Sequence, residues 1–500
     1  MAEKKGFREV PEVNLTSYVI DSGVLNLVPA TLALKFKLLP LFKVGNTLTI
    51  AMSDPKNIVA LDEVRAASKM DVSIVKANPQ DVQDAVTEYY GISGVVETAV
   101  KDYEPPKGAR GKVAGPTDAP VMKLVDEIIS QAVRERASDV HIEPEAKDVR
   151  VRYRVDGLLH QELKLPQHML APVVSRIKIL SAMNIAESRV PQDGRFEVEQ
   201  EGKKVDLRVS SFPSVYGEKV VMRILDKSLI ILKLGDIGFS KENLDKFKKI
   251  IRKPHGIVLV TGPTGSGKTT TLYSALAEID SKELNIVTVE DPVEYELAGI
   301  TQSQVNVKAG LTFASALRSI LRQDPDVILI GEIRDLETAT IAIQSALTGH
   351  LVFSTLHTND ASGALTRLLD MGVEPFLISS SVEAVLAQRL VRTVCPKCQE
   401  KISVPENIKK EYPDLKHLYK GKGCKSCKYT GFRGRIGIFE LLILDETIRK
   451  MINDKASTDE IKKHASAHGM KTLYADGIEK VKAGTTTLDE VLRVTELDQV

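Results

Sequence analysis

The segment GPTGSGKT at residues 262–269 constrains the fold of this chain more than any other stretch. It matches the pattern G-x-x-x-x-G-K-[ST], in which a Gly-rich loop wraps phosphate groups. The apolar run 257–260 predicts a buried strand before it, and residues 270–279 have helical spacing after it. A strand, a tight turn and a helix N-terminus direct backbone N–H groups at one spot. We therefore expect an α/β nucleotide-binding domain with a mainly parallel sheet.

The same motif predicts a role for each polar residue of the loop. Lys268 is expected on the β- and γ-phosphates of ATP, and the Thr269 hydroxyl on Mg²⁺. The expected nucleotide-binding residues of this segment are Gly262, Pro263, Thr264, Gly265, Ser266, Gly267, Lys268, Thr269 and Thr270.

Composition narrows the class of protein. A chain of 500 residues predicts two to four domains, and its 43% hydrophobic and 27% charged content is ordinary for a globular protein. The net charge of +1 gives no overall attraction to nucleic acid or to an anionic membrane. No apolar run approaches the roughly 20 residues that a membrane span needs. We expect a cytosolic protein that reaches a membrane only through a partner.

Two smaller α+β modules are expected before the nucleotide domain. Strand-like runs on either side of Gly45-Asn46 predict a hairpin, and Asn78 with Pro79 predicts the start of a helix. The module that contains them should end near residues 90–91. Pro, Gly and Lys are frequent in 101–119 and indicate a linker. The expected order is an N-terminal partner-docking module at 1–95, a linker at 96–119, a second module at 120–227, a linker at 228–240, and the nucleotide domain at 241–500 with a zinc-binding subdomain at about 390–440.

The run 149–155 of the second module alternates apolar and basic residues, as a strand with one buried face does. Strands are also expected at 195–199, 205–210 and 219–225. The arginines Arg150, Arg152 and Arg154 would lie together on the other face of their strand. They form either an ordinary solvated face or a surface for phosphate or an acidic neighbour.

Carboxylates follow two further expected strands of the nucleotide domain. Glu290, Asp291 and Glu294 come after the strand 285–289, and Glu332 comes after the apolar run 327–330. Ligands of open α/β sheets bind at the carboxyl ends of strands, so both groups should face the phosphate loop. Glu290 or Asp291 would hold Mg²⁺ through its water shell, while Glu294 would position and Glu332 would polarise the attacking water. The alternative for the first group is an exposed acidic turn.

One position departs from the usual Walker B pattern. Gly331 stands where an Asp normally follows the apolar strand, which leaves metal ligation to the preceding carboxylates. Two histidines, His350 and His357, flank the next expected strand and could sense the γ-phosphate or relay its state to a neighbour. A purely structural role is the alternative for each histidine.

All four cysteines occur in two C-x₂-C pairs, Cys395 with Cys398 and Cys424 with Cys427, separated by the 25 residues 399–423. Paired motifs of this kind supply four thiolates to tetrahedral Zn²⁺. Four thiolates leave no open position on the metal, so we expect a structural site. Free dithiols or a redox pair are the alternatives.

Taken together, these blocks resemble secretion-superfamily ATPases. Residues 288–295 are similar to the Asp box of that family, 321–335 to its Walker B block and 348–360 to its His box. Residues 137–144 and 189–195 are similar to the module that precedes its ATPase core. The tetracysteine motif and the additional N-terminal module favour the type II secretion and type IV pilus assembly ATPases over pilus retraction ATPases. The nucleotide-second-messenger motif Arg-Leu-Gly of some relatives is absent, which argues against cyclic-di-GMP binding.

The resemblance implies a P-loop NTPase (RecA-like) domain, a PAS-like second module and a homo-hexamer on the cytoplasmic face of the bacterial inner membrane. ATP would lie between the second module and the nucleotide domain, and Arg195, Arg208 and Arg223 would complete the site. The N-terminal module would dock on the cytoplasmic domain of an inner-membrane platform protein. Hydrolysis would drive pseudopilus assembly and protein export, or pilus assembly in the alternative. The residues 209–219 and the modest length favour secretion.

The sequence leaves two other classes of function to consider. A nucleic-acid translocase could use Arg150, Arg152 and Arg154 to follow phosphates, but the near-zero net charge opposes nucleic-acid binding. A small-molecule kinase would have no obvious use for the tetracysteine motif and the two preceding modules.

Overall fold

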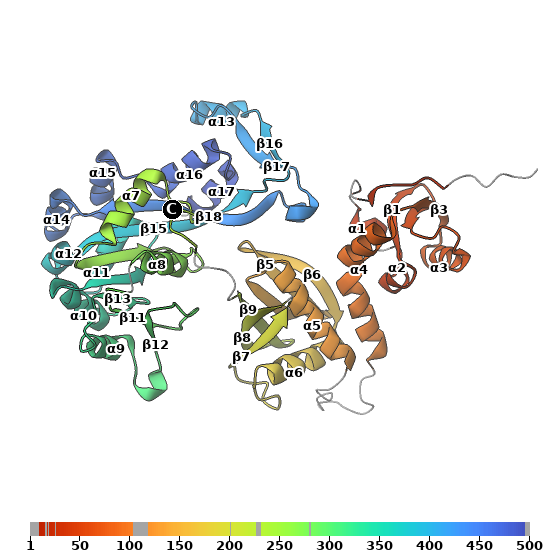
Figure 1. Ribbon diagram of the computed structural model, residues 1–500, viewed down its shortest axis with the longest axis horizontal. Helices are drawn as coiled ribbons and strands as arrows, with labels where there is room; N and C mark the ends of the chain where they lie inside the picture. Colours follow the sequence, from red (N-terminus) through yellow and green to blue (C-terminus); the bar gives the residue numbers. More distant parts are fainter. Residues whose placement is uncertain are drawn as a thin grey trace, which may run out of the picture. The chain divides into compact units, whose positions relative to one another are not determined.

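A computed structural model describes residues 10–15, 18, 20–25, 27–103, 119–200, 202–226, 232–279 and 282–495. The chain divides into two compact units, 1–226 and 227–500, which are described separately (Figure 1). Within the described ranges, no helix has both the length and the apolar character needed to cross a membrane.

The first unit begins with a small three-stranded sheet. Strands β1 (Leu38–Val44) and β2 (Thr47–Met52) pair antiparallel, and Gly45 turns between them with a φ of 59°. This confirms the predicted hairpin. Strand β3 (Asp71–Lys76) lies parallel to β2 after the crossover helix α3 (Ile58–Ser68). The short helices α1 (Ser22–Leu25) and α2 (Ala30–Phe36) precede the sheet.

Helix α4 (Pro79–Asp102) begins as predicted but is longer than expected. The Asn78 side chain caps it by accepting a hydrogen bond from the Gln80 N–H at 2.9 Å. The helix continues past residues 90–91 because apolar side chains recur at helical spacing up to Tyr103, and Ala99 and Tyr103 are buried in the core of the second module. Residues 96–102 of the predicted linker are therefore helical, and residues 104–118 lie outside the described part of the chain.

The second module is a six-stranded antiparallel sheet with helices on one face. The strand order is β6-β5-β4-β9-β8-β7, and buried side chains of two helices pack against it. The predicted strands in 149–155, 195–199, 205–210 and 219–225 are present, and the sheet has two further strands at 139–144 and 158–166. Its elements are α5 (Ala119–Arg134), β4 (Asp139–Pro144), β5 (Asp148–Val155), β6 (Leu158–Pro166), η2 (Gln167–Met169), α6 (Leu170–Leu180), β7 (Gln192–Gln200), β8 (Lys203–Ser214) and β9 (Gly217–Asp226).

The second unit is built on a seven-stranded sheet of order β12-β11-β13-β14-β10-β15-β18. All neighbouring strands are parallel except β15 and β18, which confirms the predicted α/β class. Its first elements are α7 (Lys241–Ile250), β10 (Gly256–Thr261), α8 (Lys268–Ala277), β11 (Ile286–Glu290), β12 (Thr301–Gln304), η3 (Val307–Ala309), α9 (Phe313–Ile320), β13 (Val327–Ile330), α10 (Leu336–Leu347), β14 (Leu351–Leu356), α11 (Ala361–Asp370), α12 (Pro375–Ser381) and β15 (Val382–Val394).

Both faces of this sheet are covered. In β10, Ile257 and Leu259 pack in the larger core with α9, α10 and α11, whereas Val258 and Val260 pack in the core that contains α7 and α8. The alternation explains why the strand reads as a continuous apolar run in the sequence. The phosphate loop therefore follows directly after a strand that is packed on both of its faces.

The last part of the chain adds an extension, which contains the short helix α13, and four further helices after β18. Strands β16 and β17 pair antiparallel beside the main sheet, close in sequence to the four cysteines (Figure 1). The elements are β16 (Gln399–Ile402), α13 (Glu406–Glu411), β17 (Leu418–Gly421), η4 (Lys425–Cys427), β18 (Phe432–Ile443), α14 (Glu446–Asn453), α15 (Thr458–Ala467), α16 (Leu473–Lys482) and α17 (Leu488–Thr495).

Candidate active site and metal centre

The carboxyl ends of four adjacent parallel strands lie at one edge of the second unit's sheet. Strand β11 pairs Val289 with Ile330 of β13, and β14 pairs Leu356 with Thr261 of β10. The residues that follow these strands are the acidic turn, Gly331-Glu332, His357 and the phosphate loop. The fold therefore brings together groups that the sequence placed up to 95 residues apart, from Gly262 to His357.

The phosphate loop has the geometry that its glycines permit. Gly265 and Gly267 have φ values of 79° and 90°, in the left-handed region, and helix α8 begins at Lys268. Lys268 Nζ donates to the carbonyl oxygens of Gly262 at 2.8 Å and Pro263 at 3.2 Å, so the ammonium group lies within the loop. Thr269 is exposed in the first turn of α8, where its hydroxyl is accessible to a cation.

The charge of Lys268 is held in a partly desolvated place. Burial lowers the pKa of Lys268 to about 8; the Glu332 carboxylate opposes this shift, and the Arg389 guanidinium adds to it. A phosphate group bound here would favour the charged ammonium form, because an opposite charge stabilises it.

Strand β15 supplies two residues that sequence reasoning missed. Gln388 is buried beside the loop, and a Cβ on Gly267 would lie 2.8 Å from its Nε2 atom. Its Oε1 atom accepts a hydrogen bond from Thr271 Oγ1 at 2.7 Å. Arg389 is also buried and donates to Asn359 Oδ1 at 3.3 Å. Both residues follow the apolar run 384–387 but lie inside β15, which continues to Val394, so the strand-end rule used elsewhere does not single them out.

Glu332 is fixed at the sheet edge by two basic neighbours. Arg334 Nη2 lies 2.5 Å from Glu332 Oε1, and His357 Nε2 lies 3.4 Å from Glu332 Oε2. A glycine precedes it at position 331 for a steric reason. A Cβ there would lie 3.3 Å from the Cα of Glu290 and 3.4 Å from the Val289 carbonyl oxygen. An Asp would press on the neighbouring strand at this point.

The acidic turn divides its carboxylates differently from the expectation. Glu290 is buried and points inward: its Oε2 accepts from the Tyr273 hydroxyl and its Oε1 from Thr288 Oγ1 at 2.7 Å. Burial and the Glu290 carboxylate raise the pKa of Tyr273, so this hydroxyl keeps its proton and donates. Asp291 is exposed, and Glu294 is half-buried. Of the two residues considered for Mg²⁺, Asp291 is the one open to solvent.

The two histidines lie at opposite ends of β14. His357 follows the strand and contacts Glu332, whereas His350 precedes it and its carbonyl oxygen accepts from the Gly256 N–H at 3.1 Å. The six residues of extended chain between them hold them roughly 20 Å apart. Both histidines flank β14 as predicted, but only His357 lies at the sheet edge that carries the phosphate loop. His350 lies at the opposite edge, with its Nδ1 atom 2.8 Å from the Ser345 carbonyl oxygen.

In the first unit, the face of the second module's sheet away from its helices is rich in arginine. Arg195, Arg208 and Arg223 are directly paired across β7, β8 and β9, so the three predicted arginines form one row. The row continues to Asp139 on β4, whose Oδ1 accepts from Arg223 Nε at 3.2 Å.

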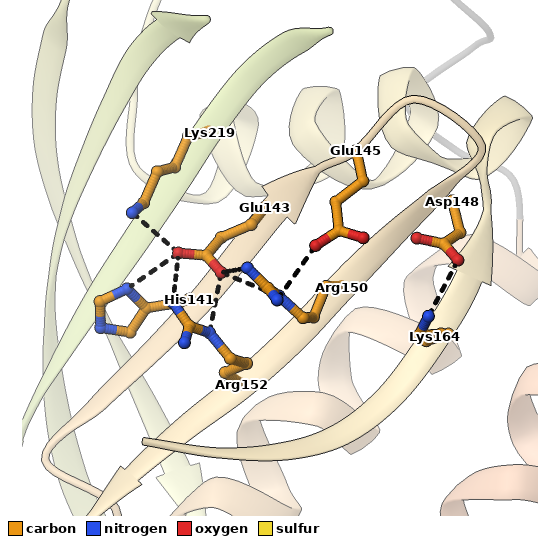
Figure 2. A network of polar contacts seen from close by, with 8 residues as sticks. All are labelled: His141, Glu143, Glu145, Asp148, Arg150, Arg152, Lys164 and Lys219. Carbon is orange, nitrogen blue, oxygen red and sulfur yellow. Dashed lines mark hydrogen bonds and ion pairs between the residues drawn. The ribbon is translucent and has the colours of Figure 1, made fainter. Parts of the chain in front are cut away.

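Beside that row, Figure 2 shows a second group of charges centred on Glu143. Arg152 donates twice to this carboxylate, at 2.8 and 2.9 Å, and Lys219 lies 2.8 Å from it. Arg150 Nε donates to it at 3.3 Å. Because Arg150 and Arg152 are engaged by a buried carboxylate, they are poorly suited to follow a nucleic-acid backbone.

The four cysteines form a compact cluster. Their sulfur atoms all lie within 4.8 Å of one another, and individual separations are 3.8 Å for Cys395–Cys424, 3.7 Å for Cys398–Cys427 and 3.8 Å for Cys424–Cys427. Tetrahedral zinc with Zn–S bonds of about 2.3 Å requires sulfur separations of about 3.8 Å. The cluster is therefore compatible with Zn²⁺ bound by four thiolates.

Two protein-family models match this chain. Residues 115–493 match the family described as type II/IV secretion system protein. The chain belongs to the type II/IV secretion system protein family. Residues 8–95 match a separate domain family, the MshEN domain.

Relatives of this family include both secretion and pilus proteins. The chain is 51% identical to the type II secretion system ATPase E of Vibrio cholerae over 76% of each chain. It is 42% identical to the type IV pilus assembly ATPase PilB of Myxococcus xanthus over 98% of this chain and 90% of that protein. A solved structure of the pilus retraction motor PilT with bound ADP covers 75% of this chain and 98% of its own, with 28% identity and a TM-score of 0.51.

Membership in the type II/IV secretion system protein family assigns the activity. The chain is an ATPase of a secretion or pilus system, and ATP is its nucleotide. The sheet edge with the phosphate loop and Glu332 is the candidate site for this nucleotide.

Proposed function

We propose that this ATPase is the cytoplasmic motor of a type II secretion system, where it works as a homo-hexamer on the cytoplasmic face of the bacterial inner membrane. The observation that carries the proposal is the convergence of the phosphate loop, Glu332 and His357 at one sheet edge, together with the 51% identity to a type II secretion ATPase over 76% of the chain. Hydrolysis would drive pseudopilus assembly and protein export.

In this proposal each residue of the site has one task. Lys268 and the loop N–H groups hold the phosphates, Thr269 and the acidic turn hold Mg²⁺, and Glu332 takes the proton of the attacking water. Glu294 and His357 orient the water and Glu332, while the row Arg195, Arg208 and Arg223 neutralises charge that develops on the phosphates. Bound Mg²⁺ would supply charge neutralisation between phosphate groups.

We assign the four cysteines a structural Zn²⁺ that closes the segment between β15 and β18. Support comes from the sulfur separations, which fit a tetrahedral metal without rearrangement. The site has four thiolates and no free position for substrate.

The alternative system is type IV pilus assembly. It is favoured by one specific observation: the similarity to PilB of Myxococcus xanthus extends over 98% of this chain, including the N-terminal module. The two systems differ in the platform protein that the N-terminal module (residues 1–95) would contact.

The experiment that separates the systems is capture of the platform from membranes with the full-length chain. We expect a type II secretion platform protein to be retained. The double variant Ile58→Asp/Val59→Asp should retain less of it, because these two exposed apolar side chains lie at the start of helix α3 of the N-terminal module. The matched control Val307→Asp changes an exposed apolar residue of the second unit. A pilus platform in the eluate would replace the proposed system by the alternative, and retention of neither would contradict both.

A further inference from the structure

A buried polar cluster lies behind the acidic turn and has no place among the roles assigned so far. It consists of Tyr273 on α8, Thr288 and Glu290 on β11, and Gln302 on β12. Tyr273 is fully buried and Glu290 is 4% exposed. We call these four residues the tyrosine–glutamate cluster.

Hydrogen bonds occupy both oxygens of the Glu290 carboxylate. Oε2 accepts from the Tyr273 hydroxyl, and Oε1 accepts from Thr288 Oγ1 at 2.7 Å and from Gln302 Nε2 at 3.2 Å. The Tyr273 oxygen also accepts from the Glu294 N–H at 3.4 Å. These three hydrogen bonds use most of the roughly four acceptor sites of the carboxylate, which is 4% exposed, and leave little room for a cation.

The cluster connects the two halves of the candidate site. Tyr273 lies on the helix that begins with Lys268, and Glu290 immediately precedes Asp291 in the acidic turn. Its bonds therefore join the phosphate-binding helix to the segment that carries Asp291 and Glu294.

Burying a carboxylate at this place has a cost that a purely structural contact would avoid. An ionised group removed from water is unfavourable unless several hydrogen bonds compensate it, and an apolar pair of the same shape is often as stable. The hydrogen bonds from Tyr273 and Gln302, however, fix directions that an apolar contact leaves free.

We propose that Tyr273 and Glu290 are positioning residues for ATP hydrolysis, which hold the acidic turn at a fixed place relative to the phosphate loop, and that Glu290 is not a direct ligand of Mg²⁺. Only the second part rests on the proposed metal site. The first part concerns the ATPase activity of the chain and the contacts of the cluster.

The test compares Tyr273→Phe, Glu290→Gln and the double variant in the full-length chain. ATP turnover is measured against ATP and, separately, against Mg²⁺ concentration. We expect each single variant to lower kcat at least tenfold, with less than threefold change in KM for ATP, because Lys268 and the loop still hold the phosphates. The double variant should be no slower than the slower single one, since both changes break the same hydrogen bond.

Two further variants serve as controls for these measurements. The Tyr295 ring packs edge-on against the Tyr273 ring, with their centroids 4.6 Å apart. Tyr295→Phe removes its hydroxyl and should keep kcat within twofold of the wild type. Asp291→Asn should raise the Mg²⁺ concentration for half-maximal turnover at least tenfold, whereas Tyr273→Phe and Glu290→Gln should change it less than threefold.

The outcomes separate the parts of the proposal. A tenfold higher Mg²⁺ requirement for Glu290→Gln alone would make Glu290 a metal ligand and overturn the assignment. Wild-type kcat in both single variants with an unchanged melting temperature would reduce the cluster to packing. An unaltered Mg²⁺ response of Asp291→Asn would instead count against the proposed metal site, and the positioning role would still be judged by kcat.

Discussion

At the scale of single residues, Glu332 is the most constrained carboxylate of the candidate site. Arg334 and His357 hold its two oxygens, and Lys268 lies near enough for the charge of Glu332 to oppose the shift of the lysine's pKa. A carboxylate held in this way can accept a proton from water without moving. Lys268, in contrast, donates hydrogen bonds to the loop that binds phosphate.

This difference predicts two distinct failures. Glu332→Gln should lower ATP turnover at least about a hundredfold, the usual contribution of a general base, while ATP still binds. Lys268→Ala should lose turnover together with tight nucleotide binding. Phosphate release and binding of a fluorescent ATP analogue measure the two effects. Glu337→Gln, at an exposed residue of α10 that pairs with Arg318, is the control and should behave as wild type. Full turnover by either site variant would refute the assignment.

A second residue-scale prediction concerns the contribution of Glu143 to stability at low pH. Burial raises its pKa, but the hydrogen bonds and charges of Arg152 and Lys219 outweigh burial and hold the pKa at about 2. A lowered pKa contributes stability above the unfolded value of 4.5, and this stability is lost as pH falls toward 2. Glu143→Gln should therefore lower the unfolding free energy of the first unit by on the order of 3 kcal/mol at pH 7.

Urea unfolding of wild type and Glu143→Gln between pH 7 and pH 2 measures this difference. It should be constant above pH 5 and shrink steadily below it. Asp148→Asn provides the control, because Asp148 pairs with a half-exposed lysine at 3.2 Å and should contribute less than about 1 kcal/mol. A difference that stays constant down to pH 2 would contradict the role of the charged network.

At the scale of elements, the sequence predicted the strand, loop and helix around residues 257–279 because period and glycine positions are local properties. It also predicted which carboxylates follow strands. The direction of a side chain depends on neighbours from other elements, and the sequence does not contain that information in readable form. Glu290 turns inward because Tyr273 of α8 meets it there.

The remaining differences have similar causes. Helix α4 is longer than predicted because its last turns pack on the second module. The sequence assigned those turns to a linker, since the packing contact depends on residues outside the helix. His350 and His357 both flank β14, but only the strand's direction decides which of them reaches the phosphate loop. The row of arginines required the register of three strands.

The tetracysteine extension gives a prediction at this scale. Removal of metal should loosen residues 395–431 while the seven-stranded sheet persists, since structural zinc can supply on the order of 10–16 kcal/mol to a small module. Hydrogen exchange after treatment with a zinc chelator measures this, and a non-chelating isomer of the same compound serves as control. Metal loss without any change in exchange would contradict a structural role.

At the scale of the whole molecule, the proposal requires that the arginine row acts in hydrolysis. Arg208→Ala should lower kcat by a factor of 10² or more, because arginines that neutralise phosphate charge contribute on the order of 10³–10⁵ elsewhere. Steady-state turnover measures it, and Arg65→Ala, an exposed arginine of α3 that pairs with Asp62, is the control. Equal turnover of Arg208→Ala and wild type would remove the row from the mechanism.

The central claim is that ATP hydrolysis at the edge of this sheet drives protein export. The most direct test measures export in cells whose own copy carries Glu332→Gln, at normal levels of the chain. The account predicts that exported proteins remain inside the cell while the variant is still captured with its membrane platform. Export at the wild-type level with this variant would contradict the account.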